Sequence, residues 1–286
     1  MDILAGMEAD NEIISRWSGS APFWDKHREM IRHMFGPVTS GLVAEARIGV
    51  GQSVLDIATG PGEPALSIVP LVGPLGRVCG IDPIPDMIAG ARREAGRLEL
   101  KNVQFELAFA DHLPFPENSF DAVVTRFGVM FFPSPLEAVR EILRVLRPGG
   151  RLVFAVWHYA AKNPFHCALS RVIDRFVEPP VLEPDAPDTF RFAAPGKLLE
   201  ILKEAGVRDP SERLLQFTID APVPVEEYWT LRLEMSKIRE RISVLSAERM
   251  AELKREALES IGEYSTGSGI SMPAEVLIVS GAKGVS

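Results

Sequence analysis

The chain has 286 residues, of which 46% are apolar and 24% charged, so it can bury a substantial core and is neither disordered nor fibrous in composition. Its 31 basic and 39 acidic side chains give a formal charge of -8, which disfavours nucleic acid as a partner. An acidic N-terminus and the lack of a long apolar run predict no membrane span and a cytoplasmic location. Two cysteines, Cys79 and Cys167, cannot form a four-thiolate zinc site, and we expect no metal site.

From Ser53 onward, short apolar runs alternate with helical patterns, which is typical of βαβ units and a parallel sheet. Helices are predicted through residues 65–69, at 85–95 and at 135–146, the last one stopped by the Pro-Gly-Gly sequence at 148–150. The predicted strands are Ser53–Ile57, Arg77–Ile81, Val103–Leu107, Asp121–Thr125 and Arg151–Trp157. The last of these is apolar on both faces, as a central parallel strand should be.

The remainder of the chain differs from this core. Helices are predicted near His166–Phe176 and at Pro195–Ala205, and strands at Arg213–Asp220 and Ala274–Gly281. About 50 residues separate these two strands, too many for a hairpin loop, so a helical lid is expected there. The first helical stripe of this lid consists of Leu231, Met235, Ile238, Ile242 and Leu245. A second helix of the lid should be capped at Ser246.

A glycine turn follows the strand that contains Asp56. Gly60 and Gly62 open the next helix, so backbone N–H groups and a positive helix end can approach a polar ligand closely. Gly60, Gly62 and Ala65 also fit the G-x-G-x-x-G/A pattern of dinucleotide-binding proteins. In a nicotinamide oxidoreductase of this kind, Asp82 would bind the ribose of the dinucleotide.

Three carboxylates decide between these interpretations. Asp56, Asp82 and Asp111 each follow or end a predicted strand, so they converge on one edge of the sheet. A pyrophosphate would be repelled there, because like charges a few Å apart cost energy in a partly dry cleft. A ligand with an ammonium group, a sulfonium and a ribose diol would be favoured, and S-adenosylmethionine has all three.

Four segments then occur in order: VLDIATGPGEPAL (54–66), GIDPIPDMI (80–88), FADHLPFPENSFDAVVTRFGVMFF (109–132) and LRVLRPGGRLVFAVW (143–157). Together they resemble the motifs of class I S-adenosylmethionine-dependent methyltransferases, especially the ubiquinone/menaquinone-biosynthesis type and related natural-product enzymes. The resemblance implies an α/β fold, a doubly wound Rossmann-like sheet of seven strands, mostly parallel with the last strand antiparallel. It also implies a helical N-terminal cap and a helical insertion between the last two strands.

We therefore predict a single methyltransferase domain. Its parts would be a helical cap at 1–50, a cofactor-binding core at 51–157, a loop, helix and sixth strand at 158–220, a helical lid at 221–272 and a last strand at 273–286.

The resemblance also assigns roles to individual residues. Asp56, Thr59 and the backbone of Gly60–Gly62 would hold the methionine moiety of S-adenosylmethionine. Asp82 would bind the ribose hydroxyls, with Pro83 and Met87 packed on adenine. Asp111 and the His112 backbone would bind the adenine edge, and Arg126 and Phe127 would line the reacting end.

The methyl acceptor is expected to be a small, largely apolar or aromatic molecule, methylated on oxygen or carbon. His158, directly after the fifth strand, and His166 are the candidate general bases for a hydroxyl acceptor. A protein that binds the cofactor without turnover is an alternative, and a homodimer contact is a second interpretation of the charged lid. Six aromatic residues are candidates for the acceptor pocket: Trp17, Phe23, Trp24, Phe127, Phe131 and Phe132.

Overall fold

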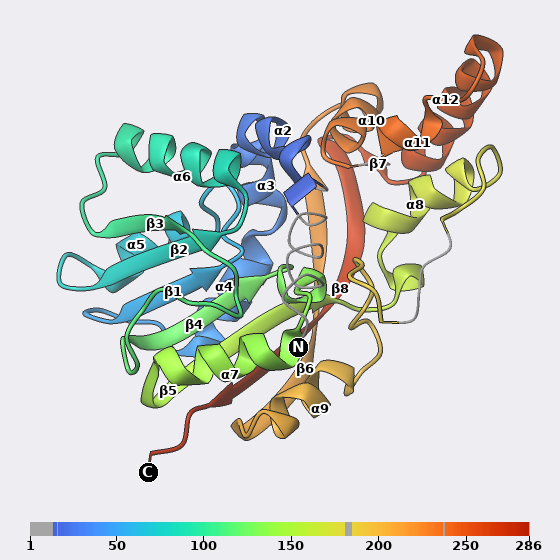
Figure 1. Cartoon of the computed structure of the whole chain (residues 1–286). Helices are drawn as coiled ribbons and strands as arrows, with labels where there is room; N and C mark the ends of the chain where they lie inside the picture. Colours follow the sequence, from blue (N-terminus) through green and yellow to red (C-terminus); the bar gives the residue numbers. More distant parts are fainter. Residues whose placement is uncertain (1–13, 16, 181–184, 237, 286) are drawn as a thin grey trace.

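The central sheet has the strand order β3-β2-β1-β4-β5-β8-β6, with a short strand β7 paired to β8 (Figure 1). This computed structural model describes residues 14–15, 17–180, 185–236 and 238–285. The first five strands are parallel, whereas β8 runs antiparallel to both β5 and β6, which confirms the predicted fold class. The strands are β1 (Ser53–Ile57), β2 (Arg77–Asp82), β3 (Val103–Leu107), β4 (Phe120–Arg126), β5 (Leu146–Trp157), β6 (Arg208–Ala221), β7 (Ser265–Thr266) and β8 (Gly269–Ala282).

Strand β1 occupies the middle of the parallel part of the sheet, and all five of its residues are buried. Its register places Asp56 beside Gly80 of β2 and Val124 of β4. A Cβ atom at Gly80 would lie 2.7 Å from the Phe105 ring and 2.8 Å from Thr59 Oγ1, so a larger residue could not be accommodated without a shift. The ends of β1 and β2 are therefore fixed by close packing.

Helices cover both faces of the sheet (Figure 1). α5 (Ala65–Val72) and α6 (Pro85–Arg97) connect β1 to β2 and β2 to β3, whereas α7 (Pro135–Val145) connects β4 to β5 in the opposite direction along the sheet. Because parallel crossovers are right-handed, this reversal puts α7 on the face opposite α5 and α6. The loops after β1 and β4 diverge at the reversal, which is where open α/β sheets bind ligands. Two further helices are α4 (Gly36–Ala46), packed on β4 and β5, and α9 (Lys197–Glu204), packed beside α7.

Two groups of helices lie over the carboxyl ends of the parallel strands (Figure 1). The cap consists of α2 (Ala21–Lys26) and α3 (Arg28–Met34), and the lid consists of α10 (Val225–Glu234), α11 (Ile238–Ile242) and α12 (Ala247–Gly262). α8 (Pro164–Ile173) packs against α12 and β8. Ser246 caps α12 as predicted, because its Oγ accepts a hydrogen bond from the Arg249 amide at 3.3 Å. Single 3-10 turns occur at η1 (Val129–Phe131) and η2 (Ala160–Lys162).

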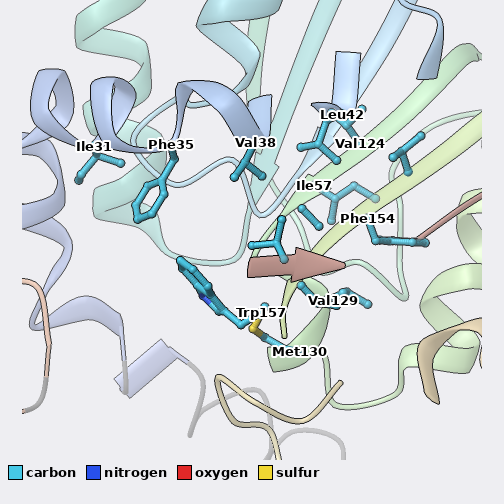
Figure 2. Close-up of a cluster of buried hydrophobic side chains, with 14 of the residues drawn as sticks. Ile31, Phe35, Val38, Leu42, Ile57, Val124, Val129, Met130, Phe154 and Trp157 are labelled. Atoms are coloured by element: carbon cyan, nitrogen blue, oxygen red, sulfur yellow. The ribbon is translucent and has the colours of Figure 1, made fainter. Parts of the chain in front are cut away.

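A continuous apolar core joins the N-terminal helices to the sheet (Figure 2). Phe35, between α3 and α4, and Val38, in the first turn of α4, are both buried. They lie among side chains from β1, β4 and β5. Full burial of an apolar side chain stabilises the fold by roughly 1.5–3 kcal/mol. The N-terminal helices are therefore part of the same folding unit as the sheet.

Two of the predicted helical segments differ in their bounds as follows. The helix predicted at 135–146 ends at Val145 and β5 begins at Leu146, and Pro148 disfavours a helical conformation in Arg147, the residue before it. The lid stripe from Leu231 to Leu245 covers two helices, α10, which ends at Glu234, and α11, which begins at Ile238.

Candidate active site

A cavity of about 660 Å³ lies at the carboxyl ends of the parallel strands, between the sheet, the cap and the lid. This volume is within the range of small-molecule sites. Four predicted site residues, Asp56, Gly62, His112 and His158, lie outside the cavity wall. The predicted residues in the wall are Thr59, Gly60, Asp82, Pro83, Met87, Asp111, Arg126, Phe127 and His166.

The glycine turn after β1 is held in place by two of the predicted carboxylates. The Gly60 amide donates to Asp82 Oδ2 at 2.9 Å, and Thr59 Oγ1 donates to Asp56 Oδ2 at 2.6 Å. Gly60 has a φ of 55° and no atom within 4 Å of where a Cβ would lie. The turn therefore presents its backbone to the cavity without a side chain in the way.

Asp56 stabilises the turn through buried hydrogen bonds outside the cavity wall. Its Oδ2 also accepts from the Ala65 amide at 2.9 Å, whereas its buried Oδ1 has no partner. Burial raises the pKa of Asp56 to about 7. Asp56 does not line the cavity and positions Thr59 and the start of α5. Its contact with the cofactor stays a prediction.

Gly62 has a packing role in this structure, and a contact of its backbone with the cofactor stays a prediction. Its φ is 111°, and an added Cβ atom would lie 2.7 Å from Leu66 Cδ1 and 3.3 Å from Ala91 Cβ. Gly62 therefore allows α5 to pack closely against α6, and its own amide donates to the Thr59 carbonyl at 3.0 Å.

Asp82 ends β2 and faces the cavity with only 6% of its surface exposed. Its Oδ1 accepts from the Ile84 amide at 3.0 Å and its Oδ2 from Gly60. Burial raises its pKa to about 6. A carboxylate oxygen accepts more than one hydrogen bond, so Asp82 can also accept from a ligand hydroxyl. Pro83 and Met87 lie beside it in the wall.

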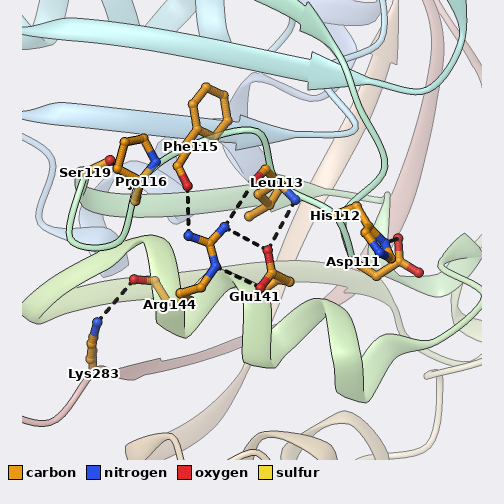
Figure 3. Close-up of polar contacts among 9 residues, drawn as sticks. All are labelled: Asp111, His112, Leu113, Phe115, Pro116, Ser119, Glu141, Arg144 and Lys283. Carbon is orange, nitrogen blue, oxygen red and sulfur yellow. Dashed lines mark hydrogen bonds and ion pairs between the residues drawn. The ribbon is translucent and has the colours of Figure 1, made fainter.

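The loop after β3 brings Asp111 to the cavity (Figure 3). Arg144 of α7 holds this loop by donating to the carbonyls of Phe115 at 2.8 Å and Leu113 at 3.0 Å. Glu141 accepts from the Leu113 amide and from Arg144. The conformation of the Asp111 loop is therefore set by side chains from another element.

His112 lies next to Asp111 but outside the cavity wall. Its side chain is exposed, with Nδ1 3.5 Å from Asp111 Oδ1, and its amide donates to the Phe109 carbonyl at 3.3 Å. That the His112 backbone contacts the adenine edge stays a prediction.

Arg126 is buried at the end of β4. Its Nη1 donates to Thr39 Oγ1 of α4 at 2.8 Å, and the carboxylates of Glu63 and Asp56 act on its charge. Burial lowers the pKa of Arg126. The guanidinium is thus held on the side of α4, with compensating negative charge close by.

Aromatic rings form the wall near β5. Phe127 stacks on Trp157 with ring centres 4.3 Å apart, and the edge of Phe35 meets both rings. The six aromatic residues predicted for the acceptor pocket all line the cavity. Sequence reasoning missed Phe35, Trp157 and Phe165, which read as ordinary core residues.

The two candidate bases differ in position. His158 Nδ1 lies 2.8 Å from Glu275 Oε2 of β8 and does not line the cavity. His158 follows Trp157, the last residue of β5, which does line the cavity. That His158 acts as a base stays a prediction.

His166, near the start of α8, lines the cavity. Its Nε2 is buried without a hydrogen-bond partner among the described residues. The ring is surrounded by Trp157, Phe165 and Phe190, with ring centres 4.5, 4.9 and 5.3 Å away. Burial, with a further contribution from the Arg232 cation, holds the pKa of His166 well below 6.5. His166 is therefore a neutral imidazole at neutral pH.

Charged groups of the wall that sequence reasoning missed include Glu63, Arg28 and Arg232. Arg28 pairs with Asp25. Arg232 stands between Leu231 and Leu233 in the sequence, and a lone arginine in an apolar stretch of the lid is the signal that could have identified it. No group of three or more metal-ligating side chains occurs in the described part of the chain. Nor does any helix there have the length and apolarity to cross a bilayer.

Comparison with known proteins agrees with this arrangement. Residues 55–154 match the family model of a methyltransferase domain. The ubiquinone/menaquinone biosynthesis C-methyltransferase of Pseudomonas putida is 39% identical over 127 residues, 44% of this chain and 48% of that protein. A demethylmenaquinone methyltransferase of Listeria monocytogenes is 37% identical over 106 residues, 37% of this chain and 45% of that protein.

The chain thus matches about half the length of these relatives. The YcgJ protein of Bacillus subtilis has a similar structure, with a TM-score of 0.57 over 86% of this chain and 97% of that one. Its sequence identity of 19% makes this a likeness of fold.

Proposed function

Because residues 55–154 form a class I S-adenosylmethionine-dependent methyltransferase domain, we propose that the chain methylates a small, largely apolar or aromatic acceptor on oxygen or carbon. One observation carries this proposal: a single cavity joins the polar edge at Gly60, Asp82 and Asp111 to the aromatic wall at Trp157. Two reactants that must meet can therefore be held side by side, away from water.

The polar edge fits S-adenosylmethionine. Gly60 leaves open space for a ligand, and Asp82 and Asp111 line the same cavity, where Asp82 would accept from the ribose hydroxyls and Asp111 from the adenine amino group. Pro83 and Met87 provide an apolar surface for the base. When bound, this cofactor supplies an electrophilic methyl group on a sulfonium. The match to a methyltransferase domain favours this ligand over the nicotinamide alternative.

The chain's own contribution to the reaction is alignment. Well-oriented reactants gain roughly 7–11 kcal/mol from proximity. The rings of Phe127, Trp157 and Phe35 exclude water and offer flat surfaces to an aromatic acceptor. The names of the two relatives support an acceptor of the quinone-precursor class, methylated on carbon in the Pseudomonas protein.

His166 supplies the base where the acceptor is a hydroxyl. Its unpartnered Nε2 would take the proton of the hydroxyl as the acceptor oxygen bonds to the methyl carbon, while the carbon–sulfur bond breaks and its electron pair stays on the sulfur of the released thioether. A carbon acceptor that is already an enolate does not require this proton transfer.

Two measurements test the proposal. Methyl-labelled S-adenosylmethionine is incubated with the protein and a panel of phenols, quinone precursors, thiols and carboxylic acids, and label must appear in an extracted product. Calorimetry with S-adenosylhomocysteine and with NADH separates the cofactor classes. Binding of NADH alone would show the proposal to be wrong, and cofactor binding without transfer to any acceptor would favour a non-catalytic binding protein.

A further inference from the structure

Arg232 of α10 is a buried cation in the wall of the cavity, with 6% of its surface exposed. Its Cζ lies 3.8 Å from the centre of the Phe165 ring, and its buried Nε has no hydrogen-bond partner among the described residues. One face of the guanidinium is therefore covered by an aromatic ring, and its N–H donors are left for another partner.

No carboxylate of the described residues forms an ion pair with Arg232, in contrast to Arg28 of the same cavity wall. Arg28 pairs with Asp25, and Arg126 lies under the influence of Glu63 and Asp56. A buried charge without a partner is costly, because desolvation is not offset by attraction. Such a group is retained at a cavity wall when a ligand completes it.

The position of Arg232 is on the acceptor side of the cavity. Phe165, on which it stacks, lies 6.0 Å from the Trp157 ring at the end of β5. Asp82 ends β2, and β1 and β4 lie between these strands, so the two ends are three strand spacings, roughly 14 Å, apart. Arg232 thus stacks on the aromatic group near the end of β5, whereas the residue proposed to bind the ribose ends β2.

We propose that Arg232 binds an ionised oxygen of the methyl acceptor, so that the acceptor is a small aromatic anion. The guanidinium donates in its plane to a carboxylate or to an ionised phenol or enol, while Phe165 and Trp157 cover the ring of the acceptor. This inference rests on the proposed function, because it takes the bound anion to be the methyl acceptor. The binding of the anion can nevertheless be measured without turnover.

The same contact would couple recognition to the neighbouring histidine. His166 and Arg232 both touch the Phe165 ring, and the Arg232 cation disfavours a proton on His166. An anion paired with Arg232 offsets this effect. Binding of the correct acceptor would therefore make His166 a stronger base.

The test measures binding by calorimetry on the protein saturated with S-adenosylhomocysteine. A hydroxybenzoate is compared with its methyl ester, and a nitrophenolate with its methyl ether. We expect at least one anion to bind more than roughly tenfold tighter than its neutral derivative, because the ion pair is desolvated. The pair that shows this preference identifies the carboxylate or the ionised phenol as the group recognised.

Arg232→Met should abolish the preference for the anion, and Arg232→Lys should retain part of it. Arg249→Met is the matched control, since Arg249 also stacks on a phenylalanine, Phe176, at 4.6 Å but is exposed and paired with Glu252. Without ligand, Arg232→Met should melt at the same temperature as the original protein or higher, because an unpaired buried charge is removed.

Equal binding of charged and neutral probes to the original protein would overturn the inference. So would a loss of S-adenosylhomocysteine affinity in Arg232→Met, since the arginine would then serve the carboxylate of the cofactor. Failure of methyl transfer with all acceptors, together with a retained Arg232-dependent anion preference, would instead refute only the proposed function.

Discussion

Glu234 Oε2, at the end of the lid helix α10, lies 2.5 Å from Nε2 of His27, the residue between the cap helices α2 and α3. Lys26 Nζ lies 2.9 Å from the same oxygen. The hydrogen bond to His27, followed by those from Lys26, lowers the pKa of Glu234. The cap and the lid, far apart in the sequence, are thus joined beside the cavity.

Glu234→Gln should loosen this junction. We expect a stability loss of at most about 1 kcal/mol, because partly exposed ion pairs contribute little. Hydrogen exchange should rise in residues 21–34 and 225–234, and S-adenosylhomocysteine should dissociate faster. Because the pKa of Glu234 is lowered, the link is present above the usual glutamate pKa and is lost only as the pH falls through the lowered value.

The control is Glu227→Gln, on the same helix but exposed and without an ion pair among the described residues. Equal exchange in the two variants would show that Glu234 does not join the cap to the lid.

The core of the fold could be predicted because local and long-range signals agree there. The strand Ser53–Ile57 has the predicted bounds, since its apolar residues Val54, Leu55 and Ile57 are buried as in a strand that is covered on both faces. The lid could be predicted only as a helical segment. Its division into α10 and α11 does not show in the apolar periodicity, which continues from Leu231 to Leu245.

The candidate site could be predicted where the position of a residue in the fold follows from its type, as for a glycine in the turn after a strand or an aspartate at a strand end. Gly60 and Asp82 lie at the cavity as expected. His158 does not, because the side of a strand that faces a ligand changes with every residue, and the sequence cannot tell whether Trp157 or His158 points inward. Arg232 reaches the cavity only through the packing of the lid.

Asp56→Asn tests the role of a buried carboxylate outside the cavity. The pKa of Asp56 is raised to about 7, so the folded state keeps its proton where the unfolded state has lost it. The contribution to stability therefore falls as the pH rises from about 4 to about 7, by at most about 1.4 kcal/mol per pH unit.

The variant should lack this contribution, and urea unfolding at pH values across this window measures the difference. S-adenosylhomocysteine affinity should stay within about threefold, as for substitutions that touch no ligand. An unchanged pH dependence of unfolding, or a large loss of affinity, would contradict the assignment of Asp56 to the turn.

Asp82→Ala should weaken S-adenosylhomocysteine binding by more than roughly tenfold, through the loss of charge-assisted hydrogen bonds to the ribose. The chain should remain folded, as judged by circular dichroism. In the original protein the pKa of Asp82 is raised to about 6. Affinity should therefore fall as the pH decreases through that value, because a protonated carboxyl accepts hydrogen bonds more weakly.

The variant should lose this pH dependence. Asp86→Ala, in the first turn of α6 and outside the cavity wall, is the control and should bind within about threefold of the original protein. Undiminished binding by Asp82→Ala would remove Asp82 from the site.

His166 and His158 can be separated with a hydroxyl acceptor. His166→Ala should lower kcat by about 100-fold or more, because a positioned base contributes about that much, and added imidazole should restore part of the rate. His158→Ala should keep kcat within about threefold but lower the melting temperature, since Glu275 loses its partner. Neutral imidazole is the active form of the base, and the pKa of His166 lies well below 6.5. The rate with a limiting, uncharged hydroxyl acceptor, which reflects the free protein, should therefore persist below that pH. A rate that survives His166→Ala and fails with His158→Ala would require a cavity arranged differently around β5.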